Sequence, residues 1–368
     1  MDRKADWRLA LARKQLYLRR KLEGVMGWRS PVEMQGFTGF YKALWQRAAA
    51  AIGASFEELA EGFWEVRRDG RMTLINNFEV RLDDPVILHL AGDKALCYRL
   101  LQRGGLPVPE HAVYSLAEFE TAAQFIRAQG PQLAVVKPSK GTSGARGVTT
   151  HIRTLPECRK ATALASLYGE AILIERWIAG ESYRLLVLDG RMIHASRRRG
   201  LRVVGDGTAT IDRLMARQIR AAGVSAADRD IVATLAAQGL TTASVLEDRR
   251  EVLVRSSPLA RHDVGEQRTV FDENVTGEIC GAIRAVAAQA AELLFSRFAG
   301  VDVITLDPTL PLIKTGGVIN EINTTPGLHH HYNLINQTGV DPASEVLVYL
   351  LSDSSRLTSP GCSTARHE

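Results

Sequence analysis

A lysine followed by three closely spaced glycines is one group of residues in this 368-residue chain that could do chemistry. The run 135–148 reads VVKPSKGTSGARGV, in which Lys137 closes an apolar stretch before Gly141, Gly144 and Gly147. Glycines let backbone N–H groups approach an anion closely, and a lysine supplies a point charge for phosphate oxygens. Because the lysine precedes the glycines, the run is neither a P-loop nor a dinucleotide-binding fingerprint. Taken alone, an ordinary turn between strands explains it at least as well.

A second group consists of oxygen ligands on two apolar segments. Asp302 lies in the first segment, and Glu321 and Asn323 lie two residues apart in the second. Side chains alternate along a strand, so Glu321 and Asn323 face one side, and antiparallel pairing of the segments would bring Asp302 beside them. Two carboxylates and an amide oxygen suit Mg²⁺, which completes its shell with water and nucleotide phosphates. Each residue alone would be an ordinary solvated strand charge.

A third segment is a short apolar strand that ends in a turn. Residues 172–174 are apolar and are followed by Glu175, Trp177, Ile178 and Glu181. Backbone groups in such a turn could bind the edge of an adenine, and acidic side chains could hold ribose hydroxyls. An inter-strand loop with exposed charges explains this segment equally well by itself.

The elements that must position these residues follow from hydrophobic spacing and turn residues. Asp-Gly pairs at 69–70 and 189–190 favour hairpins with type I′ turns. Asp93 can cap a helix that ends before Gly104, and Ser115 with Glu118 has the spacing of a capping box. The predicted core strands cover 133–136, 172–174, 301–306 and 318–322. Helices are predicted over 93–103, from 115 until Gly130-Pro131 with one apolar face, and over 279–293 with amphipathic spacing.

The overall composition is that of a globular protein that acts on small anions. Hydrophobic residues make up 45% of the chain, and the net charge of +5 is mild and scattered, which argues against a nucleic-acid groove. The four cysteines are far apart and form no zinc pattern, which favours a reducing compartment. No secretory leader or membrane-spanning run is evident, so the cytoplasm is expected, with no membrane partner.

In their order along the chain, these segments resemble the ATP-grasp superfamily, whose ligases hold ATP between two α+β lobes. The runs YRLLVLDG at 183–190, VVGDGTATI at 203–211 and NEINTTPG at 320–327 look most like the ATP-grasp module of cyanophycin synthetases, and D-alanine–D-alanine ligases are more distantly similar. The resemblance covers about 91–351. It implies an α+β (α/β) ATP-grasp fold with a short, divergent N-terminal domain over 1–107. A central lobe over 108–182 carries the Gly-rich loop, a C-terminal lobe over 183–352 carries the metal site and an insertion near 200–260, and 353–368 is expected to be a disordered tail.

The resemblance also implies a role for each site residue. ATP phosphates would contact Lys94 and Lys137, under a mobile loop with Gly141, Gly144 and Gly147. Adenine would lie at Glu175 and the backbone of Trp177 and Ile178. Mg²⁺, as two ions that Mn²⁺ can replace, would be held by Asp302, Glu321 and Asn323. The transferred phosphate and the carboxylate would face Arg184 and Arg198. Family members place an acid two residues before Arg184 as ribose ligand; this chain has Ser182, and Glu181 is expected to substitute.

The activity implied by the resemblance is ATP-dependent ligation of a carboxylate to an amine through an acyl phosphate, with an amino acid or small peptide as substrate. An inactive ATP-binding regulatory module and an ATP-grasp phosphotransferase are the alternatives, and a homo-oligomer stays open. His329, His330 and His331 follow Pro326-Gly327, where related ligases form a loop over the acceptor. Adjacent side chains diverge, which disfavours one shared metal and leaves substrate contact or a plain loop role.

Overall fold

The computed structural model describes residues 11, 13–15, 17, 31–140, 146–218, 228–256, 272–332 and 341–352, and only the backbone of 31–37. Gly141 and Gly144 of the predicted loop lie outside the described residues, as does the tail predicted over 353–368. Within the described part, no helix has the length and apolar character that crossing a bilayer requires.

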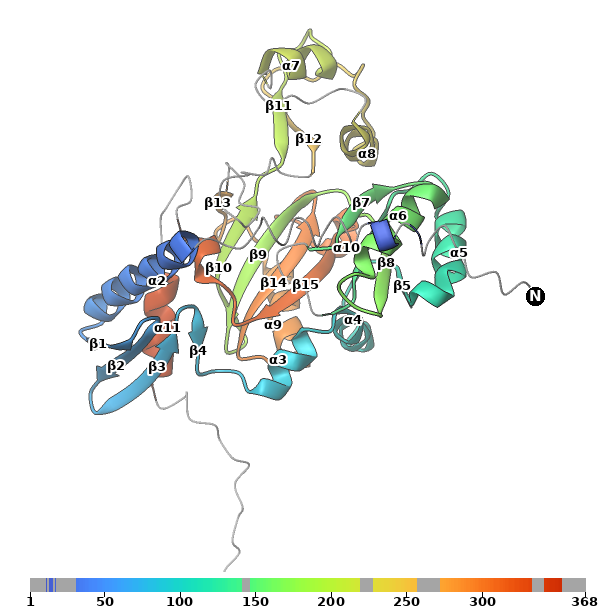
Figure 1. Cartoon of the computed structure of the whole chain (residues 1–368). Coiled ribbons are helices and arrows are strands. Elements are labelled where there is room, and N and C mark those ends of the chain that lie inside the picture. Colours follow the sequence, from blue (N-terminus) through green and yellow to red (C-terminus); the bar gives the residue numbers. More distant parts are fainter. Residues whose placement is uncertain are drawn as a thin grey trace, which may run out of the picture.

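The central lobe is a four-stranded antiparallel sheet with two helices on one face (Figure 1). Its strands, in spatial order, are β5 (His111–Tyr114), β8 (Ile172–Arg176), β6 (Ala134–Pro138) and β7 (Thr149–Ile152). The short η1 (Leu116–Glu118) leads into α5 (Phe119–Gln129), and α6 (Leu155–Ala165) follows β7. The predicted capping box of Ser115 and Glu118 is confirmed. Ala134 and Val136 join the core under the helices, so Val135 and Lys137 face away from them.

The C-terminal lobe is built on a five-stranded antiparallel sheet. Its strands, in spatial order, are β13 (Asp272–Asn274), β10 (Arg191–Arg198), β9 (Glu181–Leu188), β14 (Phe298–Thr305) and β15 (Val318–Thr324). One face packs on α9 (Gly281–Leu293) and α4 (Lys94–Arg103), with Leu185, Val187 and Val301 in that core. The short α10 (Leu312–Thr315) lies between β14 and β15 in the sequence.

The opposite face of this sheet is divided into an apolar half and a polar half. Leu186, Leu188 and Phe298 share a core with what we call the N-terminal module, residues 31–82, and with α11 (Pro342–Leu350). The module contains α2 (Pro31–Ala51), β1 (Ser55–Ala60), β2 (Phe63–Arg68), β3 (Arg71–Asn76) and β4 (Glu79–Val80). The other half of the face bears the charged residues described below.

The segment expected as one N-terminal domain over 1–107 divides between two cores. The N-terminal module packs on the apolar half of the C-terminal sheet, whereas α4 and the preceding α3 (Pro85–Ala91) belong to the core around α9. The boundary expected at 182 falls within β9. Helix α4 is therefore part of the framework that carries the site.

The predicted insertion forms a small lobe of its own, which rises above the C-terminal sheet in Figure 1. It consists of β11 (Leu201–Val204), α7 (Ile211–Gln218), α8 (Arg229–Ala237) and β12 (Glu251–Arg255), which enclose a separate apolar core. Arg229 of α8 reaches the central lobe, where its Nη1 lies 2.7 Å from the carboxylate of Glu157. The insertion thus contacts both lobes.

Both predicted hairpins are confirmed, and their turns explain why the sequence uses Asp-Gly. Asp69 and Gly70 have φ of 51° and 74°, and Asp189 and Gly190 have 46° and 74°. Positive φ at both central positions is the requirement of a type I′ turn, which asparagine, aspartate and glycine tolerate best. The second hairpin joins β9 to β10 and so sets the face on which Arg184 lies.

Candidate functional site

The three predicted metal ligands meet at the polar half of the C-terminal sheet. Strands β14 and β15 pair antiparallel, as predicted, with Asp302 directly opposite Glu321. Asn323 lies two residues further along β15, and its Nδ2 is 3.4 Å from Oδ2 of Asp302. A bulge between Asp302 and Val303 interrupts the register at this point. The pairing therefore gathers two carboxylates and one amide on one surface.

Two cations balance these carboxylates. Arg184 of β9 is in register with Asp302 and donates Nε and Nη2 to its two oxygens at 2.5 and 2.7 Å. Nζ of Lys94 lies 3.1 Å from Oε1 of Glu321. Burial alone would raise the pKa of Glu321, but Lys94, Lys137 and Arg184 lower it below its ordinary value. A lowered pKa favours the ionised form of Glu321, which its predicted role as a metal ligand requires.

Lys137 and Glu175 come from the central sheet, on the face turned away from α5 and α6. Nζ of Lys137 lies 2.8 Å from Oε1 of Glu175, and both residues are at most 5% exposed. Glu175 thus lies with the predicted phosphate-binding lysine. Two residues on, the N–H of Trp177 donates to the carbonyl of Leu133 at 2.8 Å, so this amide is already used within the lobe. Ile178 follows directly in the turn before β9.

Tyr98 of α4, which the sequence did not lead us to expect, connects the Lys137–Glu175 pair of the central sheet to β15 of the C-terminal sheet. Its hydroxyl accepts a hydrogen bond from Lys137 at 3.1 Å and lies 3.0 Å from Oε2 of Glu175 and 2.6 Å from the carbonyl oxygen of Asn320. Burial, and then the charge of Glu175, raise the pKa of this phenol well above its ordinary value, so it stays protonated. Tyr98 follows Lys94 by four residues, which places both on one face of a helix. That spacing is a signal the sequence contains.

Helix α4 places Lys94 at its first turn. Asp93 caps the helix by accepting from the N–H of Leu96 at 3.1 Å, which confirms the predicted cap. The N–H of Lys94 donates to the carbonyl of Ser139, directly after β6. Lys94 is thereby held between the end of the strand that carries Lys137 and the carboxylate of Glu321.

Gly147 is the one glycine of the predicted loop that the structure describes. Its φ is 74°, and a Cβ added there would lie 2.7 Å from the ring of Tyr168 and 2.9 Å from Pro138. Both the conformation and the close approach require glycine. The chain therefore returns from the loop tightly against the strand that bears Lys137.

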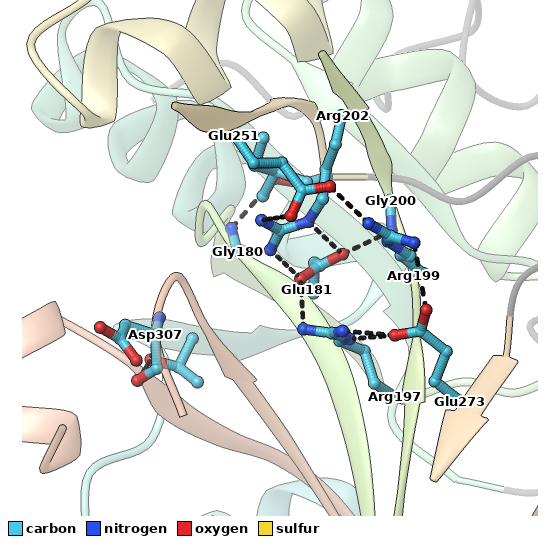
Figure 2. Close-up of polar contacts among 12 residues, drawn as sticks. Gly180, Glu181, Arg197, Arg199, Gly200, Arg202, Glu251, Glu273 and Asp307 are labelled. Atoms are coloured by element: carbon cyan, nitrogen blue, oxygen red, sulfur yellow. Dashed lines mark hydrogen bonds and ion pairs between the residues drawn. The ribbon is translucent and has the colours of Figure 1, made fainter. Parts of the chain in front are cut away.

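Glu181, the expected substitute for the missing ribose ligand, lies on the other side of β9 from Arg184. Tyr183 and Glu181 lie on the side of β9 opposite to Arg184 and Ser182, because successive side chains alternate. The carboxylate of Glu181 is 0% exposed and accepts hydrogen bonds from the N–H of Gly200 at 2.8 Å and from Nη2 of Arg202 at 2.5 Å (Figure 2). Glu181 therefore ties the insertion to the sheet on the face turned away from the predicted metal ligands.

Arg198 is brought to the face of Arg184, as expected. Strand β10 pairs Arg198 with Ser182 and Ser196 with Arg184, so all four lie on one side. The flanking Arg197 and Arg199 point to the other side, where both contact Glu273 (Figure 2). Alternation along one strand thus separates an arginine that faces the site from two that hold the framework.

The donor set fits magnesium. Asp302, Glu321 and Asn323 offer two carboxylates and an amide oxygen. Within the described residues, no group of three or more histidine, cysteine, aspartate or glutamate side chains is placed to hold a metal ion. Mg²⁺ keeps several waters and is usually held by one or two carboxylates together with substrate phosphates. Three such ligands leave about half of the six positions of one ion to water and nucleotide.

A lysine-bearing antiparallel sheet and a carboxylate-bearing sheet that meet at one site are the features of the ATP-grasp fold, and the chain has this fold. A bifunctional glutathione synthetase from Pasteurella multocida superimposes with a TM-score of 0.51 at 20% identity, over 86% of this chain and 45% of that one. The cyanophycin synthetase of Trichormus variabilis is 30% identical over 252 residues, which are 66% of this chain and 27% of that protein. A glutathione biosynthesis bifunctional protein of Streptococcus thermophilus is 27% identical over 297 residues, 76% of this chain and 38% of that protein. The chain thus spans well under half the length of these curated relatives. No family model matches it.

Proposed function

We propose that the chain is an ATP-dependent ligase that joins a carboxylate to an amine through an acyl phosphate and releases ADP and phosphate. The observation that supports this most directly is the meeting of two ionic groups from different sheets. Lys137 and Glu175 of the central lobe touch Tyr98, whose hydroxyl also reaches β15, the strand of Glu321. The similarity to cyanophycin synthetases and to glutathione biosynthesis proteins favours amino acids or small peptides as substrates.

The chemistry requires a carboxylate to become electrophilic, because carboxylates do not react with amines at neutral pH. Lys94 and Lys137 would bind phosphate oxygens of ATP, and Arg184 and Arg198 would face the donor carboxylate and the phosphoryl group that it receives. Asp302, Glu321 and Asn323 would hold Mg²⁺, which offsets charge on the phosphates during transfer.

The acyl phosphate must be protected from water, which would hydrolyse it before the amine reacts. Amide formation then releases phosphate. Positioning and charge neutralisation, rather than a covalent enzyme intermediate, account for the catalysis proposed here.

The test is ADP release with Mg-ATP and the twenty amino acids, supplied in pairs and as dipeptides, followed by mass spectrometry of the product. Lys137→Ala and Glu321→Ala should each lower ADP release by about a hundredfold or more, because each removes a charge that stabilises the transfer. Hydroxylamine should trap the intermediate as a donor-dependent hydroxamate.

Controls that remove the same charges away from the site are Lys160→Ala on α6 and Glu292→Ala on α9, both exposed. Normal turnover by Lys137→Ala or Glu321→Ala would remove that residue from the mechanism. ATP binding without ADP release for any pair would favour the regulatory module, and phosphorylated product formed without an amine would favour a phosphotransferase.

A further inference from the structure

The insertion is mounted on the stretch of chain that passes from the central lobe to the C-terminal lobe. In this stretch Gly180 precedes β9 and Glu181 opens it. At the start of the insertion, the N–H of Gly200 donates to the carboxylate of Glu181 (Figure 2). At its end, Oγ of Ser256 accepts a hydrogen bond from the N–H of Gly180 at 3.0 Å. Both ends of the insertion therefore hold consecutive residues of this crossing.

Asp230, on α8 of the insertion, lies at the end of a chain of hydrogen bonds that starts at Gly180. Its Oδ1 accepts from the N–H of Ser256 at 3.0 Å and from the hydroxyl of Thr234 at 2.9 Å. The hydroxyl oxygens of Thr234 and Ser256 lie 2.9 Å apart. Because Thr234 gives its proton to the carboxylate, Ser256 donates to Thr234 and accepts from Gly180. Every hydrogen bond in the chain thus points toward Asp230, which is buried.

The other oxygen of Asp230 faces His151, on β7 of the central lobe. Oδ2 of Asp230 lies 3.7 Å from Nε2 of His151, which is beyond hydrogen-bond distance. That nitrogen is buried and, among the residues that the structure describes, has no hydrogen-bond partner. A buried ring nitrogen without a partner is costly. A shift of about 1 Å that let Nε2 donate to Asp230 would therefore be favourable.

Arg229, the residue before Asp230, binds the central lobe beside the same ring. Its Nη1, which pairs with Glu157, also donates to the carbonyl oxygen of His151 at 3.3 Å. The side chains of Arg229 and Glu157 are 46% and 35% exposed, and ion pairs as exposed as this one are weak. The contact therefore permits the small movement that would bring His151 to Asp230.

The turn 177–180, where adenine is expected to bind, is connected to Asp230 at both ends. At its start, the indole of Trp177 lies against the ring of His151, with the two ring centroids 5.2 Å apart. At its end, the N–H of Gly180 is linked to Asp230 through the two hydroxyls described above. One carboxylate of the insertion thus supports the whole turn from the side of the insertion.

We propose that Asp230 is a positioning residue for adenine: as the lobes approach each other around the nucleotide, His151 closes onto Asp230 and fixes the turn 177–180. This inference rests on the proposed function. The proposed ligands of the triphosphate, Lys137 and Glu321 among them, take no part in this network. The insertion therefore acts on the adenosine part of ATP, without touching the nucleotide itself.

Binding of two ligands separates this role from general damage. Inorganic tripolyphosphate has a triphosphate chain but no adenosine, and it can be titrated calorimetrically with Mg²⁺ as ATP can. His151→Phe keeps a ring against Trp177 but loses the donor, and Ser256→Ala removes the link to the turn. Each should raise the Kd for Mg-ATP about fivefold, the effect of one lost hydrogen bond, and change the Kd for Mg-tripolyphosphate by less than about twofold. His151→Gln, whose side-chain amide can donate to Asp230, should recover part of the loss.

The matched controls are His89→Phe, at an exposed histidine on α3, and Ser166→Ala, which removes a buried hydroxyl that donates to the carbonyl of Ala163 at 2.9 Å. Neither should change either Kd. Equal weakening of both ligands in His151→Phe and Ser256→Ala would mean a general structural role. Unchanged binding of Mg-ATP would mean that the turn needs no support from the insertion. Either result refutes the proposal.

Hydrogen exchange of the full-length chain tests the network without any reaction. The amide of Gly180 should exchange about tenfold faster in Ser256→Ala, and Mg-ATP should slow its exchange less in His151→Phe than in wild type. Unchanged exchange in Ser256→Ala would overturn the inference. If the wild-type chain binds neither ligand, the proposed function fails, and exchange at Gly180 still decides whether the network holds the turn. If it binds Mg-ATP but releases no ADP with any amino-acid pair, the ligase activity fails and the two Kd values alone decide on Asp230.

Discussion

Replacing Glu181 by glutamine distinguishes a framework residue from a nucleotide ligand. Glu181→Gln keeps the shape of the side chain but removes the charge that faces Arg202, 2.5 Å away, and Arg197, 3.8 Å away. Removing one partner of a buried ion pair costs about 3–5 kcal/mol, because the other charge stays buried without compensation. Arg197 still pairs with Glu273, and Arg202 still lies 3.6 Å from Glu251. We therefore expect the free energy of unfolding to fall by about 3 kcal/mol, the lower end of that range.

The assay for this substitution pairs urea unfolding with calorimetric titration of Mg-ATP. If Glu181 stabilises the fold and does not bind ATP, the free energy of unfolding should be clearly lower in Glu181→Gln. The affinity of the folded protein for ATP should then change by less than about threefold. A suitable control is Glu120→Gln, which breaks an exposed pair with Arg127 and should leave stability at the wild-type value. Unchanged stability combined with ATP binding weakened about tenfold or more would refute this reasoning and restore Glu181 as a ribose ligand.

Two further perturbations test the buried polar groups. Burial lowers the pKa of His194 to about 4, so the unfolded chain, with a pKa near 6.5, binds the proton more tightly than the folded one. His194 should therefore contribute a fall in stability of up to about 1.4 kcal/mol per pH unit as pH drops from 6.5 toward 4, and His194→Gln should reduce the measured slope by that contribution in urea titrations at several pH values. Tyr98→Phe leaves the carbonyl of Asn320 without its 2.6 Å partner, and should cost about 1–3 kcal/mol in unfolding free energy and raise the KM for ATP through the freed Lys137.

Local rules were sufficient for the residues that gather on the C-terminal sheet. The alternation of side chains placed Glu321 and Asn323 on one face, and the short connection between the two strands made antiparallel pairing with the strand of Asp302 the natural expectation. The Asp-Gly turns were equally local, because a type I′ turn requires positive φ at both central positions. In each case the deciding interaction joins residues close in sequence.

The same rule separates Glu181 from the residues that gather around Arg184. Arg184 and Ser182 differ by two positions and share a face, whereas Glu181 differs from Arg184 by three and must face the opposite side. The expectation for Glu181 depends on its nearness to Arg184 in sequence and not on the side of the strand that the two residues occupy. Tyr98 was missed although its four-residue spacing from Lys94 was visible.

No local rule could have predicted the contact between Tyr41 and His329, which are 288 residues apart. That contact exists because the N-terminal module covers only the apolar half of the sheet face and meets the short η3 (Leu328–His331) where that half ends. The proposed ATP-binding residues come from the two sheets and α4, and alternation along a strand or spacing along a helix could place each of them. The contact of Tyr41 with His329 depends instead on how two distant parts of the chain pack, which no local pattern encodes.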